Sequence, residues 1–257
     1  MNYAREQALK EQLALVSRMS VPEAMDLLKI SESTARRLFQ KLEKEGYCIR
    51  THGGIQAINQ TLGLYSFSHD VHRNMGKTTA IAREACKYLE QGDIVFFDSG
   101  MITQCMCMEL IQRIRRDKLF IKVYTNSLAN LKLLSPHLQV HLIGGEYRDH
   151  RRDFCGYLTE KALEDLYFTK TFVEANGYIG SKTFTTTDFE TARTNQIAMR
   201  NSQQTFMLVD SSNFGRISHV PYINSNINQL IITDNDVKPS IIKELNLSKT
   251  QIVSVNK

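Results

Sequence analysis

The chain has 257 residues, of which 42% are hydrophobic and 23% charged, with four prolines and a formal net charge of +5. This composition excludes collagen, a low-complexity disordered chain and a small disulfide scaffold, and the length fits one large domain or two unequal ones. No apolar run approaches the roughly 20 residues that cross a bilayer, and no signal-peptide core follows Met1. We therefore expect a soluble, cytoplasmic protein with no membrane partner. The net charge hints at an anionic partner but is too small to identify one.

The five cysteines, at positions 48, 86, 105, 107 and 155, are too few and too irregularly spaced for a disulfide framework. Cys105 and Cys107 form a C-x-C pair, but no second Cys or His pair stands at zinc-finger spacing. Cysteines among apolar residues are commonly buried thiols. We expect no metal site and no cofactor.

Residues 1–57 are predicted to be mainly helical. An apolar set with helical spacing marks a first helix: Leu9, Leu13, Leu15 and Val16. A second helix begins near Ser20, which is a good N-cap, and Pro22 is tolerated in a first helical turn. The side chains that this second helix is expected to bury are Ala24, Leu27 and Leu28.

A third helix is predicted from its cap at Ser31 to about Glu45, before a stop at Gly46. Its apolar positions form one stripe: Ala35, Leu38, Phe39 and Leu42. Residues 47–55 then resemble a short β-hairpin that turns near Gly53 and Gly54. A helix, a helix-turn-helix and a hairpin in this order are the layout of a winged helix.

Polar and basic side chains cover the face of the third helix opposite its apolar stripe: Ser33, Arg36, Arg37, Gln40, Lys41 and Lys44. Such side chains suit a helix that enters the major groove and reaches phosphates and base edges. Arg50 and His52 on the hairpin are placed to contact the adjacent backbone or minor groove. A polar helix face is also an ordinary solvated surface. Because residues 1–57 hold 9 Lys/Arg and 7 Asp/Glu, charge does not decide the matter, and the prediction depends on the order of the elements.

Residues 58–76 are predicted to be a linker, and from Lys77 onward helices alternate with short apolar runs. These runs, each long enough for a buried strand, are Ile94–Phe97, Phe120–Tyr124, Val140–Ile143, Thr171–Val173, Phe206–Val209, Leu230–Ile232 and Ile252–Val255. The predicted helices are 77–90, 102–116, 127–134, 157–166, 188–201 and 238–245. Strands that are apolar on both faces and separated by helices indicate an α/β domain with a doubly wound parallel sheet.

In such a sheet, ligands bind beyond the carboxyl ends of the strands, near a topological switch point. Small, polar or glycine residues follow most of the predicted strands: Asp98-Ser99-Gly100, Thr125-Asn126-Ser127, Gly144-Gly145, Glu174-Ala175-Asn176-Gly177, Asp210-Ser211-Ser212 and Thr233-Asp234. The junction at Asp98, Ser99 and Gly100 is the sharpest. Glycine lets the backbone approach a ligand, and a helix N-terminus favours an anion, so a phosphate there would be held by backbone N–H groups and Ser99.

Other features of this edge have two interpretations each. Gly144 and Gly145 fit a ligand rim or a simple tight turn. The basic run of Arg148, Arg151 and Arg152, with His150 among them, is either a solvated loop or a second anion contact.

The carboxylates at the strand ends are also open to two roles. Asp98, Glu174 and Asp210 are candidate acid or base groups, or acceptors for sugar hydroxyls. No Ser/His/Asp order or metal set accompanies them, and the Walker A and G-x-G-x-x-G patterns are absent. Nucleoside triphosphate or dinucleotide binding therefore has no support.

The chain resembles the DeoR-type bacterial transcriptional regulators (the DeoR/GlpR type), on blocks that span nearly its whole length. In the N-terminal part they are Ile30-Ser31-Glu32-Ser33-Thr34-Ala35-Arg36-Arg37, Leu42-Glu43-Lys44-Glu45-Gly46 and Arg50-Thr51-His52-Gly53-Gly54. In the C-terminal part they are Asp98-Ser99-Gly100, Thr125-Asn126-Ser127, Leu142-Ile143-Gly144-Gly145-Glu146-Tyr147-Arg148, Thr185-Thr186-Thr187 and Asp210-Ser211-Ser212-Asn213-Phe214-Gly215.

The resemblance implies a repressor of carbohydrate-uptake or catabolic genes. Its fold would be a winged helix-turn-helix domain at 1–57, a linker at 58–76 and an α/β sensor domain at 77–257, similar to ribose-5-phosphate isomerase and related sugar-phosphate enzymes. The expected partners are a double-stranded DNA operator and a phosphorylated sugar effector, and the expected assembly is a homodimer or homotetramer.

Two sets of site residues follow. The DNA-binding set is Ser31, Ser33, Thr34, Arg36, Arg37, Lys41, Arg50 and His52. The effector-binding set is Lys77, Asp98, Ser99, Gly100, Thr125, Asn126, Gly144, Gly145, Arg148, Asn176, Thr186 and Asp210.

Five positions depart from the family pattern: Leu38, Met101, Ile102, Gln196 and Asn213. Leu38 stands where an acidic residue commonly follows the two arginines. Met101 and Ile102 replace hydroxyl residues, while Gln196 and Asn213 replace lysines. Two effectors fit these departures: a ligand whose phosphate is placed differently, on the Arg148–Arg152 loop for example, or a less anionic ligand.

We therefore predict a ligand-controlled DNA-binding repressor that is not an enzyme and has no catalytic residues. The alternative is a sugar-phosphate isomerase with an accessory domain, in which Asp98 or Glu174 is the base, but such an enzyme has no evident need for residues 20–54 as written. A third reading is a metabolite-binding scaffold that does not bind DNA.

Overall fold

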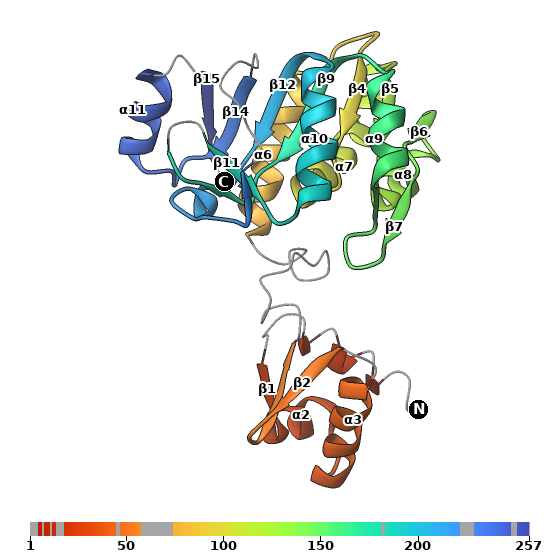
Figure 1. Cartoon of the computed structure of the whole chain (residues 1–257), viewed down its shortest axis with the longest axis vertical. Coiled ribbons are helices and arrows are strands. Elements are labelled where there is room, and N and C mark those ends of the chain that lie inside the picture. Colours follow the sequence, from red (N-terminus) through yellow and green to blue (C-terminus); the bar gives the residue numbers. More distant parts are fainter. Residues whose placement is uncertain are drawn as a thin grey trace. The chain divides into compact units, whose positions relative to one another are not determined.

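A computed structural model describes residues 5–6, 8–10, 12–13, 18–44, 47–57, 74–180, 183–221, 229–247 and 251–256. The chain divides into two compact units, Met1–Arg73 and Asn74–Lys257, each with its own hydrophobic core (Figure 1). Most of the predicted linker at 58–76 lies outside the described residues, and helix α6 (Met75–Lys87) begins within its last part. The predicted domain boundaries therefore stay predictions.

In the N-terminal unit, the described residues between 5 and 13 are helical. Leu9 and Leu13 are buried as predicted, whereas Leu15 and Val16 lie outside the described residues. Helix α2 (Val21–Leu28) starts at Ser20, whose hydroxyl accepts from the Glu23 N–H while the Glu23 carboxylate accepts from the Ser20 N–H. This capping box satisfies two N–H groups at once, which explains why the helix starts there.

The burial of α2 differs from the prediction at one position. Leu27 is 44% exposed, so the expectation that it is buried is wrong. The buried stripe of the helix is formed by Val21 and Ala24, with Leu28 packed against the core, and Leu27 lies beside that stripe. Helix α3 (Glu32–Lys44) follows the prediction, because Ala35, Leu38, Phe39 and Leu42 are all buried.

A three-stranded antiparallel sheet completes this unit, in the order β1-β3-β2. The predicted hairpin is present as β2 (Cys48–Thr51) and β3 (Gly54–Ala57), while β1 (Arg18–Ser20) is a short strand that the sequence pattern did not predict. The turn uses Gly53 at φ +89°, a backbone conformation that favours glycine. Gly54 pairs with Ser20, and a Cβ there would lie 2.2 Å from the Met19 carbonyl oxygen.

The C-terminal unit contains a seven-stranded sheet in which every neighbouring pair is parallel. In spatial order its strands are β15 (Gln251–Val255), β14 (Gln229–Asp234), β12 (Ser202–Leu208), β9 (Phe168–Glu174), β4 (Ile94–Phe97), β5 (Lys122–Thr125) and β6 (Val140–Leu142). The chain runs outward from β4 to β6, returns to the other side of β4 at β9, and then continues to β15. This is the predicted doubly wound topology, with its switch point between β4 and β9.

Helices cover both faces of this sheet, as the strand composition predicts. On one face lie α6, α7 (Met101–Asp117) and α8 (Leu128–Leu134); on the other lie α9 (Tyr157–Glu164) and α10 (Phe189–Arg200) (Figure 1). Helix α11 (Pro239–Leu247) packs beside β15. The buried rings of Phe172 and Phe206 stack 4.5 Å apart in the core between neighbouring strands.

Several short elements lie outside the main sheet and were not predicted. The hairpin β7 (Glu146–Arg148) and β8 (Asp153–Cys155) contains the basic run in its turn, and a small sheet joins β10 (Gly177–Tyr178), β11 (Phe184–Thr186) and β13 (Val220–Pro221). A 3-10 turn, η1 (Ser211–Asn213), follows β12. Strands of two or three residues are too short to give a periodicity that can be detected.

One predicted strand is misplaced at its start. The run Phe120–Tyr124 was expected to be strand, but β5 begins at Lys122 and Phe120 is 65% exposed. The backbone of Phe120 instead bonds to the loop before β4, through the Gly92 N–H and the Gln91 side chain. Among the helices of the described ranges, none is both long and apolar enough to span a membrane.

Gly54 offers a test of the three-stranded sheet. We expect Gly54→Ala to destabilise the N-terminal unit by about 2 kcal/mol or more, because the added methyl group meets the backbone of β1 and cannot be relieved by a rotamer change. Gly76→Ala is the control, since a Cβ at this helical glycine has open space. Urea unfolding followed by circular dichroism measures both, and equal stability of the two variants would contradict the packing described.

Candidate functional site

The outward face of α3 carries the residues predicted to contact DNA. Ser33, Arg36, Arg37, Lys41 and Lys44 are exposed, while the opposite face of the helix packs into the core. The hydroxyls at the start of the helix lie together, since Ser31 Oγ is 3.1 Å from Ser33 Oγ and 3.0 Å from Thr34 Oγ1. Hydroxyls at a helix N-terminus suit contacts to phosphate oxygens.

The cations on this face differ in how firmly they are held. Arg36 pairs with Glu32 one turn earlier, at 2.7 Å between Nη2 and the carboxylate, and both side chains are more than half exposed. Lys41 pairs at 2.6 Å with Glu6, whose carboxylate is largely buried. The hydrogen bond from Lys41 lowers the pKa of Glu6. Lys41 is thus tied to the first helix, whereas Arg36 keeps an exposed pair that exchanges easily with solvent.

The hairpin places its two predicted residues on the surface. Arg50 and His52 are exposed, the latter at the β2–β3 turn, and the Arg50 backbone N–H donates to Glu43 of α3 at 3.0 Å. This bond fixes the hairpin to the end of the helix. The structure therefore presents one helix face and one hairpin tip as exposed basic surfaces of the same unit.

In the C-terminal unit, the predicted ligand rim is built around Asp98 at the switch point. Asp98 follows β4, is 4% exposed, and accepts four hydrogen bonds. Its Oδ1 accepts from the Gly100 N–H at 3.0 Å and the Thr103 hydroxyl at 2.9 Å, and its Oδ2 accepts from the Glu174 N–H at 2.7 Å and the Asn195 amide at 3.3 Å. Burial raises the pKa of the Asp98 carboxyl, while these backbone and hydroxyl donors act in the opposite direction.

The N-terminus of α7 was expected to hold a phosphate, and the structure places the Glu174 carboxylate there. The Thr103 N–H donates to Glu174 Oε1 at 2.8 Å, and a Cβ on Gly100 would lie 2.1 Å from the Glu174 carboxyl carbon. The carboxylate therefore occupies the space that glycine leaves open at the helix start. Ser99, the other expected phosphate contact, donates to Asp153 at 2.7 Å.

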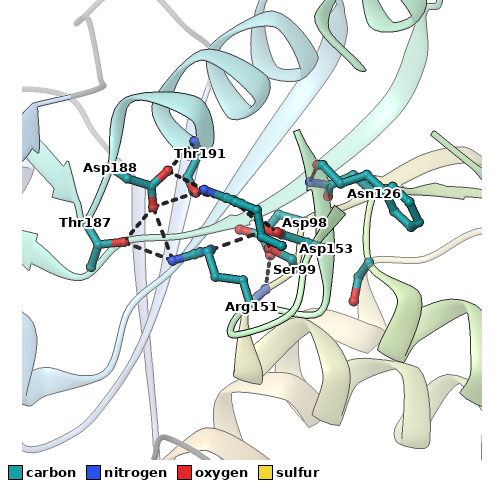
Figure 2. Close-up of polar contacts among 12 residues, drawn as sticks. Asp98, Ser99, Asn126, Arg151, Asp153, Thr187, Asp188 and Thr191 are labelled. Carbon is teal, nitrogen blue, oxygen red and sulfur yellow. Dashed lines mark hydrogen bonds and ion pairs between the residues drawn. The ribbon is translucent and has the colours of Figure 1, made fainter. Parts of the chain in front are cut away.

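Two arginines of the basic run, Arg148 and Arg151, are held in ion pairs, whereas Arg152 and His150 are exposed. Arg148 forms a two-point ion pair with Asp153, at 2.9 and 2.7 Å, and bonds Asp188 at 2.8 Å. Arg151, 4% exposed, donates to Asp153 at 3.3 Å and to the Thr187 hydroxyl at 2.9 Å (Figure 2). Burial by itself would raise the pKa of Asp188, but the guanidiniums of Arg151 and Arg148 hold it well below its usual range.

The remaining predicted residues fall into separate groups. Thr125 Oγ1 accepts from the Asn130 amide at 3.3 Å, close to Asp98, whose carbonyl accepts from the same amide. Gly144 and Gly145 form a turn packed against α9, where Thr159 donates to the Gly144 carbonyl at 2.9 Å. Asn176 accepts from Thr186 at 3.1 Å.

Lys77 of α6 and Asp210 lie next to the ends of β12 and β14. Lys77 contacts the Ser211 hydroxyl at 2.6 Å and the Asp234 carboxylate at 3.3 Å. Asp210 caps η1 through the Ser212 N–H. These two residues thus belong to a second polar cluster along the same edge of the sheet.

The sequence prediction missed several residues of the rim: Thr103, Asn195, Asp153, Asp188 and Thr191. Asp188 is the N-cap of α10 and accepts from the Thr191 N–H, so its capping position was a detectable signal. Asn195 and Asp153 depend on contacts with distant segments, whereas Thr103 and Thr191 bond carboxylates five and three residues earlier in the chain.

Both units match known families. A model described as a DeoR-like helix-turn-helix domain matches residues 5–61, and one described as a DeoR C terminal sensor domain matches residues 73–235. A lactose phosphotransferase system repressor of Lactococcus lactis subsp. lactis is 31% identical over 244 residues, 93% of this chain and 94% of that protein. An uncharacterized HTH-type transcriptional regulator of Bacillus subtilis (strain 168) is 29% identical and covers 98% of this chain, with 96% of its own length matched. Among solved structures, ribose 5-phosphate isomerase A from Methanocaldococcus jannaschii aligns with a TM-score of 0.41 and 16% identity, over 53% of each chain.

The buried ion pairs of the rim give a stability prediction. We expect Arg148→Ala to lower the free energy of unfolding by about 3 kcal/mol, because it leaves the fully buried Asp153 with one fewer cation and removes a partner of Asp188. Lys161→Ala, which removes an exposed pair with Glu164, is the control and should have no measurable effect. Urea unfolding measures both free energies of unfolding. An Arg148→Ala variant as stable as the unaltered chain would show that these ion pairs do not hold the β7–β8 hairpin.

Proposed function

The chain belongs to the DeoR family of transcriptional regulators, and from this premise we propose that it represses a carbohydrate-uptake or catabolic operon under the control of a small-molecule effector. The family assignment confirms the resemblance drawn from the sequence. The relatives named as lactose phosphotransferase system repressors support a role in sugar regulation for this chain. The operator and the effector themselves are parts of the proposal.

The observation that carries DNA binding is the exposed basic face of α3. A helix of a helix-turn-helix unit enters the major groove with the face that does not pack on its own core. Here that face holds Arg36 and Arg37, and Arg50 and His52 lie on the hairpin of the same unit. We assign base-edge contacts to the two arginines, since a guanidinium binds guanine with two parallel hydrogen bonds.

The other predicted DNA contacts take positioning roles in this proposal. Ser31, Ser33 and Thr34 lie at the helix start, where they would bind phosphate oxygens. Lys41 is held by Glu6, so we assign it a role in fixing the first helix against α3, next to the proposed DNA contacts.

Control by an effector requires that it bind two arrangements of the protein with different affinity. We propose that the rim at the ends of β4 and β9 is the effector site and that a dimer or tetramer changes between DNA-binding and non-binding arrangements. The phosphorylated sugar expected from the sequence remains the first candidate for the effector. The rim residues proposed to contact it are Asp98, Ser99, Gly100, Thr125, Asn126, Arg148, Asn176 and Thr186, with Lys77, Gly144, Gly145 and Asp210 at its margins.

The isomerase alternative is disfavoured by the state of its two proposed bases. The Asp98 carboxylate already accepts four hydrogen bonds from the protein, and Glu174 accepts from the backbone of α7. A general base needs a free lone pair within reach of the substrate proton. We therefore propose that the C-terminal unit binds its ligand without turnover.

The DNA-binding proposal is tested by Arg36→Ala combined with Arg37→Ala. We expect affinity for the DNA upstream of the chain's own gene to fall about 100-fold at physiological salt, because two base contacts of about 1–3 kcal/mol each are lost. Fluorescence anisotropy measures the affinity, and circular dichroism checks the fold.

The matched control replaces two arginines of the C-terminal unit, Arg83→Ala with Arg193→Ala, which are similarly exposed. It removes the same net charge away from α3, so it should retain operator affinity. If both double variants bind the operator like the unaltered chain, α3 is not the recognition helix.

A further inference from the structure

The carboxylate of Glu174 lies at the N-terminus of α7, a position of the rim where a helix would bind an anion. Helix α7 starts at Gly100, which has no side chain to cap the free N–H groups, and Glu174 reaches over from the end of β9 to accept from the Thr103 N–H at 2.8 Å. The backbone N–H groups and the helix dipole at this terminus favour negative charge. A protein carboxylate therefore satisfies what a ligand phosphate would otherwise satisfy.

The space at this terminus is shaped for that carboxylate. A Cβ at Gly100 would lie 2.1 Å from both the carboxyl carbon and Oε1 of Glu174, so glycine is the residue that leaves room for it. Met101 and Ile102, the next two residues, are buried and have no polar side-chain atoms to offer a phosphate. With Glu174 in place, the space above Gly100 and the Thr103 N–H are taken.

The cations of the rim do not replace the anion site that Glu174 occupies at the N-terminus of α7. Arg148 and Arg151 are paired with Asp153 and Asp188, two buried guanidiniums against two carboxylates. Asp98 and Glu174 add two further carboxyl groups, and the Thr103 hydroxyl is within 3.3 Å of both. A phosphate dianion entering here would meet an excess of negative charge in a poorly hydrated site.

Acceptors without donors lie at the same edge. The buried Asn126, 3% exposed, has a side-chain oxygen without a hydrogen-bond partner, and so has Asn130, which is fully buried and whose amide contacts Asp98. Phe97 of β4 pairs in register with Thr125 of β5, so Asp98 and Asn126 leave their strands side by side. Buried acceptors without a partner are costly, and a ligand hydroxyl supplies the missing donor, whereas a phosphate dianion does not.

We infer that Glu174 sets the charge selectivity of the effector site: it bars phosphate from the N-terminus of α7, so that the effector meets this part of the rim through hydroxyl groups. The inference rests on the proposed function in one respect, that this rim is the effector site. It deepens that proposal, because it places any phosphate of a sugar effector away from α7.

The inference is tested by removing the Glu174 carboxylate, which should turn the N-terminus of α7 into a phosphate site. We expect Glu174→Ala to gain binding of inorganic phosphate, with a dissociation constant at least 10-fold lower than that of the unaltered chain, because the Thr103 N–H and the pocket above Gly100 become available. Isothermal titration calorimetry and thermal shift, with phosphate as the only added ligand, measure the gain. Any phosphate bound at the DNA-contacting face is the same in both proteins and cancels in the comparison.

Two further variants keep the outcome decisive. Glu174→Ser also removes the carboxylate and leaves the space above Gly100 open, and it should also bind phosphate more tightly than the unaltered chain, which settles the question if Glu174→Ala does not fold. Glu190→Ala, which removes an exposed carboxylate from the first turn of α10, should bind phosphate no better than the unaltered chain.

The inference is overturned if the unaltered chain binds phosphate as tightly as the folded Glu174 variants, or if those variants bind none. Operator affinity of all the proteins is measured in parallel. Loss of operator binding in every protein, the unaltered chain included, refutes the proposed function, while the phosphate comparison separately decides the role of Glu174.

Discussion

Asp98 is a carboxylate that the fold buries, and the groups that satisfy it come from four different elements. Its two oxygens accept from the loop before α7, from α7 itself, from β9 and from α10. A buried charge without such partners costs several kcal/mol, so these elements must keep their positions for the unit to fold. The doubly wound topology makes this possible, because it brings the carboxyl ends of β4 and β9 together although they are separated by more than 70 residues.

The same constraint extends outward through Ser99. Its hydroxyl donates to Asp153, and Asp153 in turn holds Arg148 and Arg151. The two arginines then reach Asp188, the N-cap of α10. The β7–β8 hairpin is thus held to the rim by these ion pairs together with hydrogen bonds between Asn126 and Phe154. A ligand that entered here would find its contacts positioned in advance, and the cost of arranging them would already lie in the folding of the unit.

Features that depend on local sequence could be predicted, and features that depend on contacts between distant segments could not. The Ser20 cap of α2, the buried stripe of α3 and all seven strands of the parallel sheet follow from capping, from helical periodicity and from short apolar runs. The positions of Asp98 and Asn126 at one edge of the sheet follow from the rule that the carboxyl ends of parallel strands meet there. In contrast, Lys41 and its partner Glu6 are 35 residues apart in the sequence. Glu174 and Thr103 of α7, which are joined by a hydrogen bond, are 71 residues apart. Glu174 was recognised as a strand-end carboxylate, but nothing in the sequence around it shows that it caps a helix from another strand.

Exposure decides what an ion pair can do in each unit. The Arg36–Glu32 pair is more than half exposed, so water competes with it and the guanidinium can exchange a carboxylate for a base edge or a phosphate at little cost. The Arg148–Asp153 pair is 12% and 0% exposed, and removing either partner would leave a charge without hydration. The first arrangement suits a residue that must change partners, and the second suits one that must not. Net charge does not distinguish the two arginines, whereas their burial does, and this difference supports the recognition role that we propose for Arg36.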